Sequence, residues 1–277
     1  MITFLKLGGS LITDKDTPHT ARADVIRRLA EEIREVWETN KAPLLIGHGS
    51  GSFGHVPAKK YGTRSGVHSQ SEWAGFAEVH AEALDLNHIV ISIFREAELP
   101  VLSFAPMNSV RSDDGKITCW DTGEIKNCFQ RHLIPVIFGD TVFDDSRGGT
   151  ILSTEDLFVH LSDVFDEPPR ILLAGLENGV WLDYPRNTNL LHEIFAEDLD
   201  YDQFIRGSSS TDVTGGMHEK VRLMQELIRN RKADSALIFS GIQPGNLKNA
   251  LAGSRPGTAI LKEKISLFSE SHDMINL

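Results

Sequence analysis

The sequence predicts an α/β protein built on a central, mainly parallel sheet that helices cover on both faces. Short apolar runs alternate along the chain with longer segments of helical periodicity, an order that implies right-handed βαβ units. The apolar runs are continuous instead of alternating with polar residues, as in strands buried on both faces. No internal repeat stands out, so we expect a single domain over residues 1–277.

The predicted strands are short runs rich in Ile, Leu, Val and Phe. In chain order they are residues 2–7, 44–46, 100–104, 135–138, 170–173 and 236–239. Two hairpins are added to these strands. Asp113-Asp114-Gly115 marks a turn within residues 110–120, and a second turn is expected around residues 144–149.

The predicted helices follow from apolar residues that recur on one face. Residues 23–39 come first, and residues 71–97 follow with Ser69 or Ser71 as the N-cap. Residues 153–165 begin with Ser153 as N-cap and Asp156 three positions later, the spacing of a capping box. In residues 217–231 one face is formed by Val221, Met224, Leu227 and Ile228.

Two glycine-rich turns directly follow the first two predicted strands. They are Lys6-Leu7-Gly8-Gly9-Ser10 and Gly47-His48-Gly49-Ser50-Gly51-Ser52-Phe53-Gly54-His55. Glycine lets backbone N–H groups approach a ligand closely, so such turns form anion-binding nests. With Lys6, Lys15 and His55 nearby, two such turns predict two phosphorylated ligands that face each other, as a phosphotransferase requires.

Other motifs of phosphate and acyl chemistry fit less well. A Walker A loop is absent. Gly49-x-Gly51-x-x-Gly54 matches the dinucleotide fingerprint, but the chain about 20 residues later is inside a predicted helix instead of at an acidic strand end. A Gly-x-Ser-x-Gly nucleophile elbow is absent from this region, which disfavours an esterase.

Composition excludes several other classes. The net charge of −11 argues against a non-specific nucleic-acid-binding protein. Cys119 and Cys128 are the only cysteines, which indicates neither a disulfide framework nor a zinc cluster. No leader and no membrane-spanning run are visible, so we expect a cytoplasmic protein without membrane partners.

The two glycine turns, Asp140, Ser153-Thr154-Glu155-Asp156 and Asp212-Val213-Thr214-Gly215-Gly216-Met217-x-x-Lys220 together resemble the amino acid kinase superfamily. Gly51-Ser52-Phe53-Gly54-His55 resembles the isopentenyl phosphate kinases in particular, with fosfomycin kinases as close kin. The resemblance implies an open αβα sandwich that uses ATP and Mg²⁺, with the metal held mainly by the nucleotide phosphates, and a homodimer. We expect an acceptor-binding lobe over residues 1–168 and a nucleotide-binding lobe over residues 169–277, both on one sheet.

Most of the side chains expected to take part in catalysis are charged: lysines that contact phosphate groups and aspartates that hold other groups in place. Lys6 is expected to bridge the donor and acceptor phosphates, and Lys15 to close over the transferring group. Lys220 lies in the first turn of a helix whose Gly215 and Gly216 offer N–H groups to the ATP phosphates. Asp156 is expected to hold these lysines in place. Asp140 is expected to brace the first glycine turn or to help organise the metal.

The remaining site residues divide between the two substrates. For ATP they are Lys6, Gly8, Gly9, Ser10, Gly51, Gly215, Gly216 and Lys220. For the acceptor they are Ser50, Gly54, His55 and Thr154, and a slot for its tail is expected along Trp73, Phe76, Ala77, Val79, His80, Ala83 and Ile93. No residue is assigned as a metal ligand, and His48 is interpreted as structural.

His55 discriminates between acceptor classes. An alcohol needs a general base, whereas a phosphate monoester, with a second pKa of about 6, is already an oxyanion near neutral pH. A histidine N–H in the acceptor loop therefore favours a phosphate or phosphonate. Together with this preference, the resemblance to isopentenyl phosphate kinases implies a kinase for isopentenyl phosphate. The alternatives are a fosfomycin-type phosphonate kinase, another small-acid kinase of the superfamily, or a non-catalytic nucleotide sensor.

Overall fold

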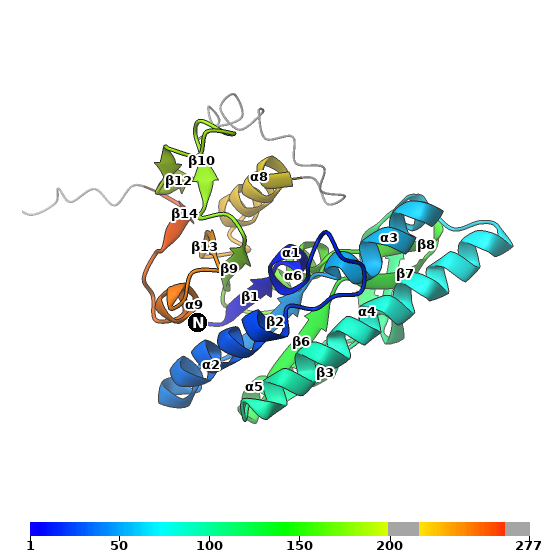
Figure 1. Ribbon diagram of the computed structural model, residues 1–277, viewed down its shortest axis with the longest axis horizontal. Coiled ribbons are helices and arrows are strands. Elements are labelled where there is room, and N and C mark those ends of the chain that lie inside the picture. Colours follow the sequence, from blue (N-terminus) through cyan, green and yellow to red (C-terminus); the bar gives the residue numbers. More distant parts are fainter. Residues whose placement is uncertain (199–215, 264–277) are drawn as a thin grey trace, which may run out of the picture.

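The computed structural model describes residues 1–198 and 216–263, and an eight-stranded sheet forms its centre (Figure 1). The strand order is β12-β14-β13-β9-β1-β2-β6-β3, and every neighbouring pair is parallel except β13 and β14. The strands are β1 (Thr3–Leu7), β2 (Leu44–His48), β3 (Val101–Phe104), β6 (Ile134–Phe138), β9 (Arg170–Gly175), β12 (Glu193–Phe195), β13 (Ser235–Ser240) and β14 (Gly257–Leu261).

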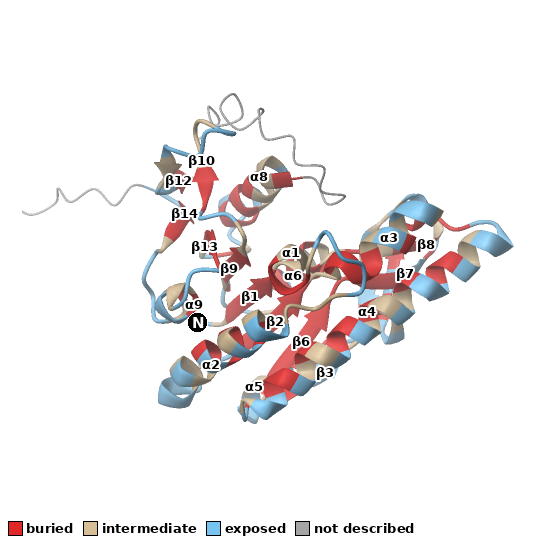
Figure 2. Cartoon of the chain, in the orientation of Figure 1, coloured by how far each residue is buried: buried red, intermediate tan, exposed pale blue. Residues whose placement is uncertain are grey.

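Helices cover both faces of this sheet, which confirms the predicted αβα sandwich. One hydrophobic cluster joins the sheet to α2 (Ala23–Asn40), α4 (Gln70–Glu96) and α9 (Asn246–Leu251). A second cluster on the opposite face includes α5 (Gly123–Gln130), α6 (Thr154–Ser162) and α8 (Gly216–Arg229). Figure 2 shows the strands buried between helices whose outer sides are exposed.

Successive residues of the central strands enter opposite clusters. In β1, Leu5 and Leu7 join the cluster of α2 and α4, whereas Phe4 joins that of α6 and α8. Alternate side chains of a strand point to opposite faces, so a strand in a double-sided sheet needs apolar residues at every position. This is the physical origin of the continuous apolar runs.

Both expected hairpins are present in a second sheet, of order β5-β4-β7-β8. Its strands are β4 (Val110–Asp113), β5 (Lys116–Trp120), β7 (Asp140–Asp144) and β8 (Gly148–Leu152). The buried Asp144 carboxylate stabilises both turns, because it accepts hydrogen bonds from the Gly115 and Arg147 N–H groups at 2.8 Å. A small third sheet pairs β10 (Val180–Trp181) with β11 (Leu190–Leu191).

The structure confirms all six predicted strands and all four predicted helices, with shifts at their ends. Capping boxes begin α4 at Ser69 with Glu72, and α6 at Ser153 with Asp156. Sequence analysis missed the helices α5 and α9 and the strands β10, β11, β12 and β14. It also missed the short helix α1 (Gly9–Ile12) and α3 (Gly51–Tyr61). Both start inside the glycine turns, where glycine lowers helix propensity and tertiary packing decides the conformation.

The connections place the glycine turns at the centre of the sheet. β1 lies between β2 and β9, so the chain leaves it toward one side and later returns on the other. In open α/β sheets, ligands bind at such a switch point, beyond the carboxyl ends of the strands. Within the described ranges, no helix combines the length and apolarity required to cross a bilayer.

Candidate active site

The two glycine turns are in direct backbone contact. A Cβ atom on Gly9 would lie 2.5 Å from the Gly51 nitrogen, and one on Gly49 would lie 3.0 Å from the Gly9 nitrogen. Gly51 also has φ of +51°, a conformation that favours glycine. The contact therefore excludes side chains at these positions and brings the ends of β1 and β2 to one point.

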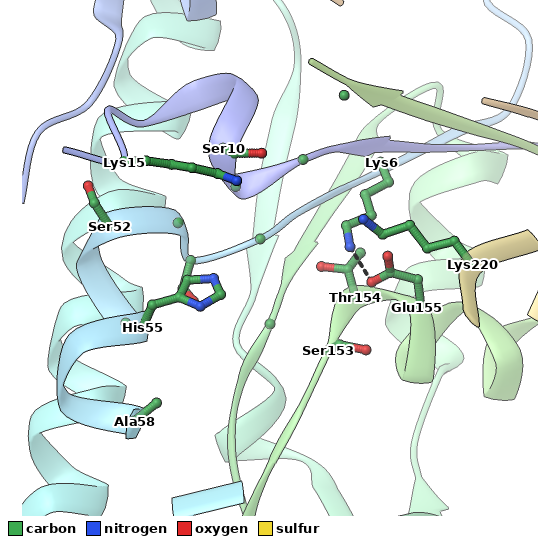
Figure 3. A pocket seen from close by; sticks show the side chains of 18 of the residues that line it. Lys6, Ser10, Lys15, Ser52, His55, Ala58, Ser153, Thr154, Glu155 and Lys220 are labelled. Carbon is green, nitrogen blue, oxygen red and sulfur yellow. Dashed lines mark hydrogen bonds and ion pairs between the residues drawn. The ribbon is translucent and has the colours of Figure 1, made fainter. Parts of the chain in front are cut away.

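A cavity of about 890 Å³ opens along this contact (Figure 3). It is lined by most of the predicted site residues, namely Lys6, Gly8, Gly9, Ser10, Lys15, Ser50, Gly51, Gly54, His55, Thr154 and Lys220. Gly216, the buried first residue of α8, is not in the lining, and Gly215 lies outside the described residues. Asp156 lines a separate cavity of about 310 Å³ beside it.

Lys6 forms a buried ion pair with Glu155. Their side chains are 11% and 8% exposed, and they come from the end of β1 and the first turn of α6. Burial alone would raise the pKa of Glu155, but the charges of Lys6 and Lys220 outweigh burial and lower it. Figure 3 shows Lys6 and Lys220 converging on Glu155 from β1 and α8. Glu155 therefore stays ionised between two cationic side chains.

The prediction that Asp156 holds the lysines is wrong for Lys6, since Glu155 makes that contact. The Asp156 carboxylate instead accepts hydrogen bonds from the N–H and hydroxyl of Ser153, each at 2.7 Å. It also lies 3.4 Å from the Arg64 guanidinium. The N-cap spacing, already visible in the sequence, assigns Asp156 to the cap and turns the preceding carboxylate toward the cavity.

More cations surround the cavity than sequence analysis identified. Lys59 and Lys60 from α3, and Arg64 from the short helix η1 (Thr63–Ser65), also line it. Together with the predicted lysines they create a positive potential inside a protein whose net charge is −11. Such local focusing favours anionic ligands.

His55 and Lys15 reach the cavity from two different segments, and Figure 3 shows both across from Lys6, Glu155 and Lys220. His55 lies on the first turns of α3, half-buried, and Figure 3 shows its ring at the cavity. Gly54 allows the Ser50 side chain to pack beneath this turn, since a Cβ atom there would lie 2.7 Å from Ser50 Oγ. Lys15 is exposed on a loop that a β-bridge between Thr13 and Ala21 closes at its base.

Thr154 joins α6 to the end of β2. Its hydroxyl donates a 2.7 Å hydrogen bond to the His48 carbonyl, and its methyl group packs where Gly47 has no side chain. Thr154 thus lines the cavity with its hydroxyl already engaged. His48 is fully buried and stacked on Phe138, which confirms its structural interpretation; burial lowers its pKa.

Asp140 does not contact the first glycine turn. Its buried carboxylate accepts a hydrogen bond from His80 Nδ1 at 2.9 Å and from the Met107 N–H at 3.2 Å. The hydrogen bond that His80 donates to Asp140 is the main reason that the pKa of His80 is raised, against the opposing effect of burial. Asp140 therefore connects β7 to α4, and not to the first glycine turn at residues 8–10 as expected.

The apolar end of the cavity differs from the predicted tail slot. Val79 and Ala83 of α4 do line the cavity, together with Val56, Ile151 and Leu152. The other expected residues are not in its lining: Trp73, Phe76, Ala77, His80 and Ile93. Trp73 and Phe76 pack on Phe143, while Ile93 lies in the core. Helix α3, which sequence analysis missed, packs against α4 and contributes Val56 to the lining.

The other end of the cavity is formed by the segment after β9. Residues 174–177 and Trp181 line it, with Tyr184 and Met217 completing the wall. The Trp181 indole N–H donates a 3.0 Å hydrogen bond to Glu177. This wall thus carries two aromatic side chains, Trp181 and Tyr184.

The described residues contain no group of three or more His, Cys, Asp or Glu side chains that could hold a metal ion. A buried oxygen of Glu155, Oε1, nevertheless has no hydrogen-bond partner within the described chain. One carboxylate oxygen fits a cation that keeps several waters and takes most of its ligands from phosphates, as Mg²⁺ does.

Comparisons with known proteins agree with this geometry. The amino acid kinase family model matches residues 1–240. The isopentenyl phosphate kinase of Methanocaldococcus jannaschii is 33% identical over 270 residues, which cover 94% of this chain and 98% of that protein. The isopentenyl phosphate kinase of Haloferax volcanii is 33% identical over 265 residues, which cover 95% and 99%, respectively.

A solved structure described as an isopentenyl phosphate kinase has the same fold. It superposes with a TM-score of 0.77 and 27% identity, and the match covers 94% of this chain and 100% of the other. The family match, the relatives and the fold all span both glycine turns and the sheet beneath them. The chain therefore belongs to the amino acid kinase family and, within it, to the isopentenyl phosphate kinases.

Proposed function

We propose that this chain transfers the γ-phosphoryl group of ATP to isopentenyl phosphate, forming isopentenyl diphosphate and ADP. The observation that carries the proposal is the backbone contact between Gly9 and Gly51 inside one cation-lined cavity. Each turn suits one phosphate group, so two phosphorylated substrates would meet at the contact.

The acceptor would bind on the side of α3. His55 would donate a hydrogen bond to its phosphate, and Ser50 and Gly54 would complete the cradle. A phosphate oxyanion needs orientation instead of a general base, which fits a cavity where the Glu155 carboxylate is already paired with Lys6. The tail would extend toward Val56, Val79 and Ala83.

The nucleotide would bind on the side of β9 and α8. Its phosphates would lie at Gly8, Gly9 and Ser10, with Gly51, Gly216 and Lys220 nearby, and its base near Trp181. Gly215 belongs to the same proposed site. The described chain offers no acceptor within hydrogen-bond distance of the Gly9 and Ser10 N–H groups, which are thus available for phosphate oxygens.

Charge neutralisation would supply most of the rate enhancement. In-line phosphoryl transfer requires positioning and stabilisation of charge on the transferred group, with little covalent chemistry from the protein. Lys6 and Lys220 would bridge the two phosphates, and Lys15 would close over them. Glu155 would hold Lys6 at this position. Mg²⁺, bound mainly by the nucleotide phosphates, would neutralise charge on the donor.

The lobes and the assembly are part of the same proposal. We assign acceptor binding to residues 1–168 and nucleotide binding to residues 169–277, with the sheet continuing between them through β1 and β9. We further propose a homodimer that works in the cytoplasm. Sedimentation analysis of the purified protein would test the dimer.

A panel of acceptors in an ADP-release assay tests the function. Isopentenyl phosphate, fosfomycin, acetate and an amino acid would be compared at saturating ATP and Mg²⁺. We expect kcat/KM to be highest for isopentenyl phosphate. Preferential turnover of fosfomycin would identify a phosphonate kinase, and tight ATP binding with no ADP release from any acceptor would identify a sensor.

A further inference from the structure

One buried hydroxyl connects the two glycine turns. Thr13, at the C-terminal end of α1, is fully buried. Its Oγ1 donates a 2.8 Å hydrogen bond to the Gly9 carbonyl and accepts a 3.0 Å hydrogen bond from the Ser52 N–H. The Thr13 hydroxyl thus links the second glycine turn to the first through two consecutive hydrogen bonds.

The Thr13 side chain also packs closely against Gly51 of the second glycine turn. A Cβ atom on Gly51 would lie 2.1 Å from Thr13 Oγ1 and 2.7 Å from Thr13 Cγ2. The Gly9 carbonyl also accepts the Thr13 N–H at 2.9 Å, so both donors of Thr13 converge on one oxygen. The threonine therefore has little freedom, and neither turn can move without it.

Thr13 also serves as the cap of α3. The N-cap of this helix, Ser50, makes no side-chain capping bond within the described chain. The first N–H groups of a helix need acceptors, and the Thr13 hydroxyl, 39 positions away in sequence, supplies one to Ser52. The Ser50 hydroxyl, which lines the cavity, is consequently not required for the cap.

We infer that Thr13 is a positioning residue that sets the separation of the donor and acceptor phosphates. The inference rests on the proposed function, in which the first turn binds the nucleotide phosphates and the second binds the acceptor. Reacting atoms must approach within about 3–3.5 Å, and a misplacement of about 1 Å can slow a reaction by about 100-fold. A hydroxyl that joins the two cradles therefore acts on turnover more than on the binding of either substrate.

The test compares Thr13→Val, which is close to isosteric but lacks the hydroxyl, with Thr13→Ser, which keeps it. We expect Thr13→Val to lower kcat by about 10-fold or more, with KM for ATP and for isopentenyl phosphate within about 3-fold of wild type. Thr13→Ser should retain kcat within about 3-fold. Ser162→Ala, which removes a buried hydroxyl-to-carbonyl bond in α6, is the control and should leave kcat unchanged.

Hydrogen exchange at the Ser52 amide provides a readout that does not depend on activity. We expect faster exchange in Thr13→Val than in wild type and Thr13→Ser. An unchanged exchange rate, or a folded Thr13→Val enzyme with wild-type kcat, would overturn the inference. If Thr13→Val does not fold, Thr13→Ala takes its place, and failure of both to fold would assign Thr13 to stability alone and overturn it as well. A wild-type protein that does not phosphorylate isopentenyl phosphate would contradict the proposed function, while the exchange comparison would still decide the link through Thr13.

Discussion

The Lys6 ammonium group is paired with the Glu155 carboxylate, 149 positions away, where the carboxyl end of β1 meets the N-terminus of α6. Both side chains are almost fully buried, and Lys220 acts on the same carboxylate from α8. A carboxylate at the start of a helix is also favoured by the helix dipole. The ion pair thus holds the Lys6 ammonium group in a fixed position at the cavity wall.

Removing the Lys6 charge should abolish most turnover. We expect Lys6→Met to lower kcat by about 100-fold or more, because a cation that stabilises the transferred group is lost. The variant should also be less stable, because Glu155 then remains buried without its nearest counter-charge. Steady-state kinetics and thermal unfolding measure the two effects.

The double variant Lys6→Met/Glu155→Gln separates the two effects. Replacing the unpaired carboxylate by a neutral amide should recover part of the lost stability without recovering kcat. Recovery of turnover in the double variant would mean that Lys6 serves only to neutralise Glu155.

The adjacent carboxylates of Glu155 and Asp156 should have different roles. We expect Glu155→Gln to lower kcat by about 10-fold or more, because Lys6 loses the partner that orients it. Asp156→Ala should instead lower the free energy of unfolding by about 1 kcal/mol through loss of the cap, with kcat within about 3-fold of wild type. Kinetics and chemical denaturation of both variants check this, and a larger kinetic defect in Asp156→Ala would reverse the assignment.

His55 should act on the acceptor. We expect His55→Ala to raise KM for isopentenyl phosphate by about 10-fold, the scale of one hydrogen bond to a charged group, while KM for ATP changes little. His88→Ala, on the exposed side of α4, is the matched control. Equal KM values for the acceptor in His55→Ala and wild type would remove His55 from the site.

The His80–Asp140 pair should make stability depend on pH. The hydrogen bond to Asp140 raises the pKa of His80 above its usual value near 6.5. A raised folded-state pKa means that the contribution is complete below pH 6.5 and is lost as the pH rises through the folded-state value. Thermal unfolding of wild type and His80→Asn between pH 5.5 and 8.5 should show the wild-type advantage decreasing with pH, and an advantage that grows with pH would contradict the pairing.

The sequence alone determined the features that depend on neighbours along the chain. Apolar runs and helical periodicity specified six of the eight strands of the central sheet and four of the helices, since each pattern reflects burial on two faces or one. The glycine turns after the first two strands indicated a phosphate site. The capping box at Ser153 and Asp156 was visible for the same reason, because a cap involves residues only three positions apart.

Only the tertiary structure decided what depends on residues brought together by topology. The capping box already assigned Asp156 to the start of α6, but the pairing of Glu155 with Lys6 depends on how α6 packs against β1. The Thr13 bridge joins positions 39 apart, and its hydroxyl caps α3 from outside the helix. The apolar lining of the cavity likewise differs from the predicted slot, because it includes Val56 of α3, a helix that sequence analysis missed, and Ile151 and Leu152 of β8. Local propensity carries no information on such contacts, whose free energy arises from packing between distant segments.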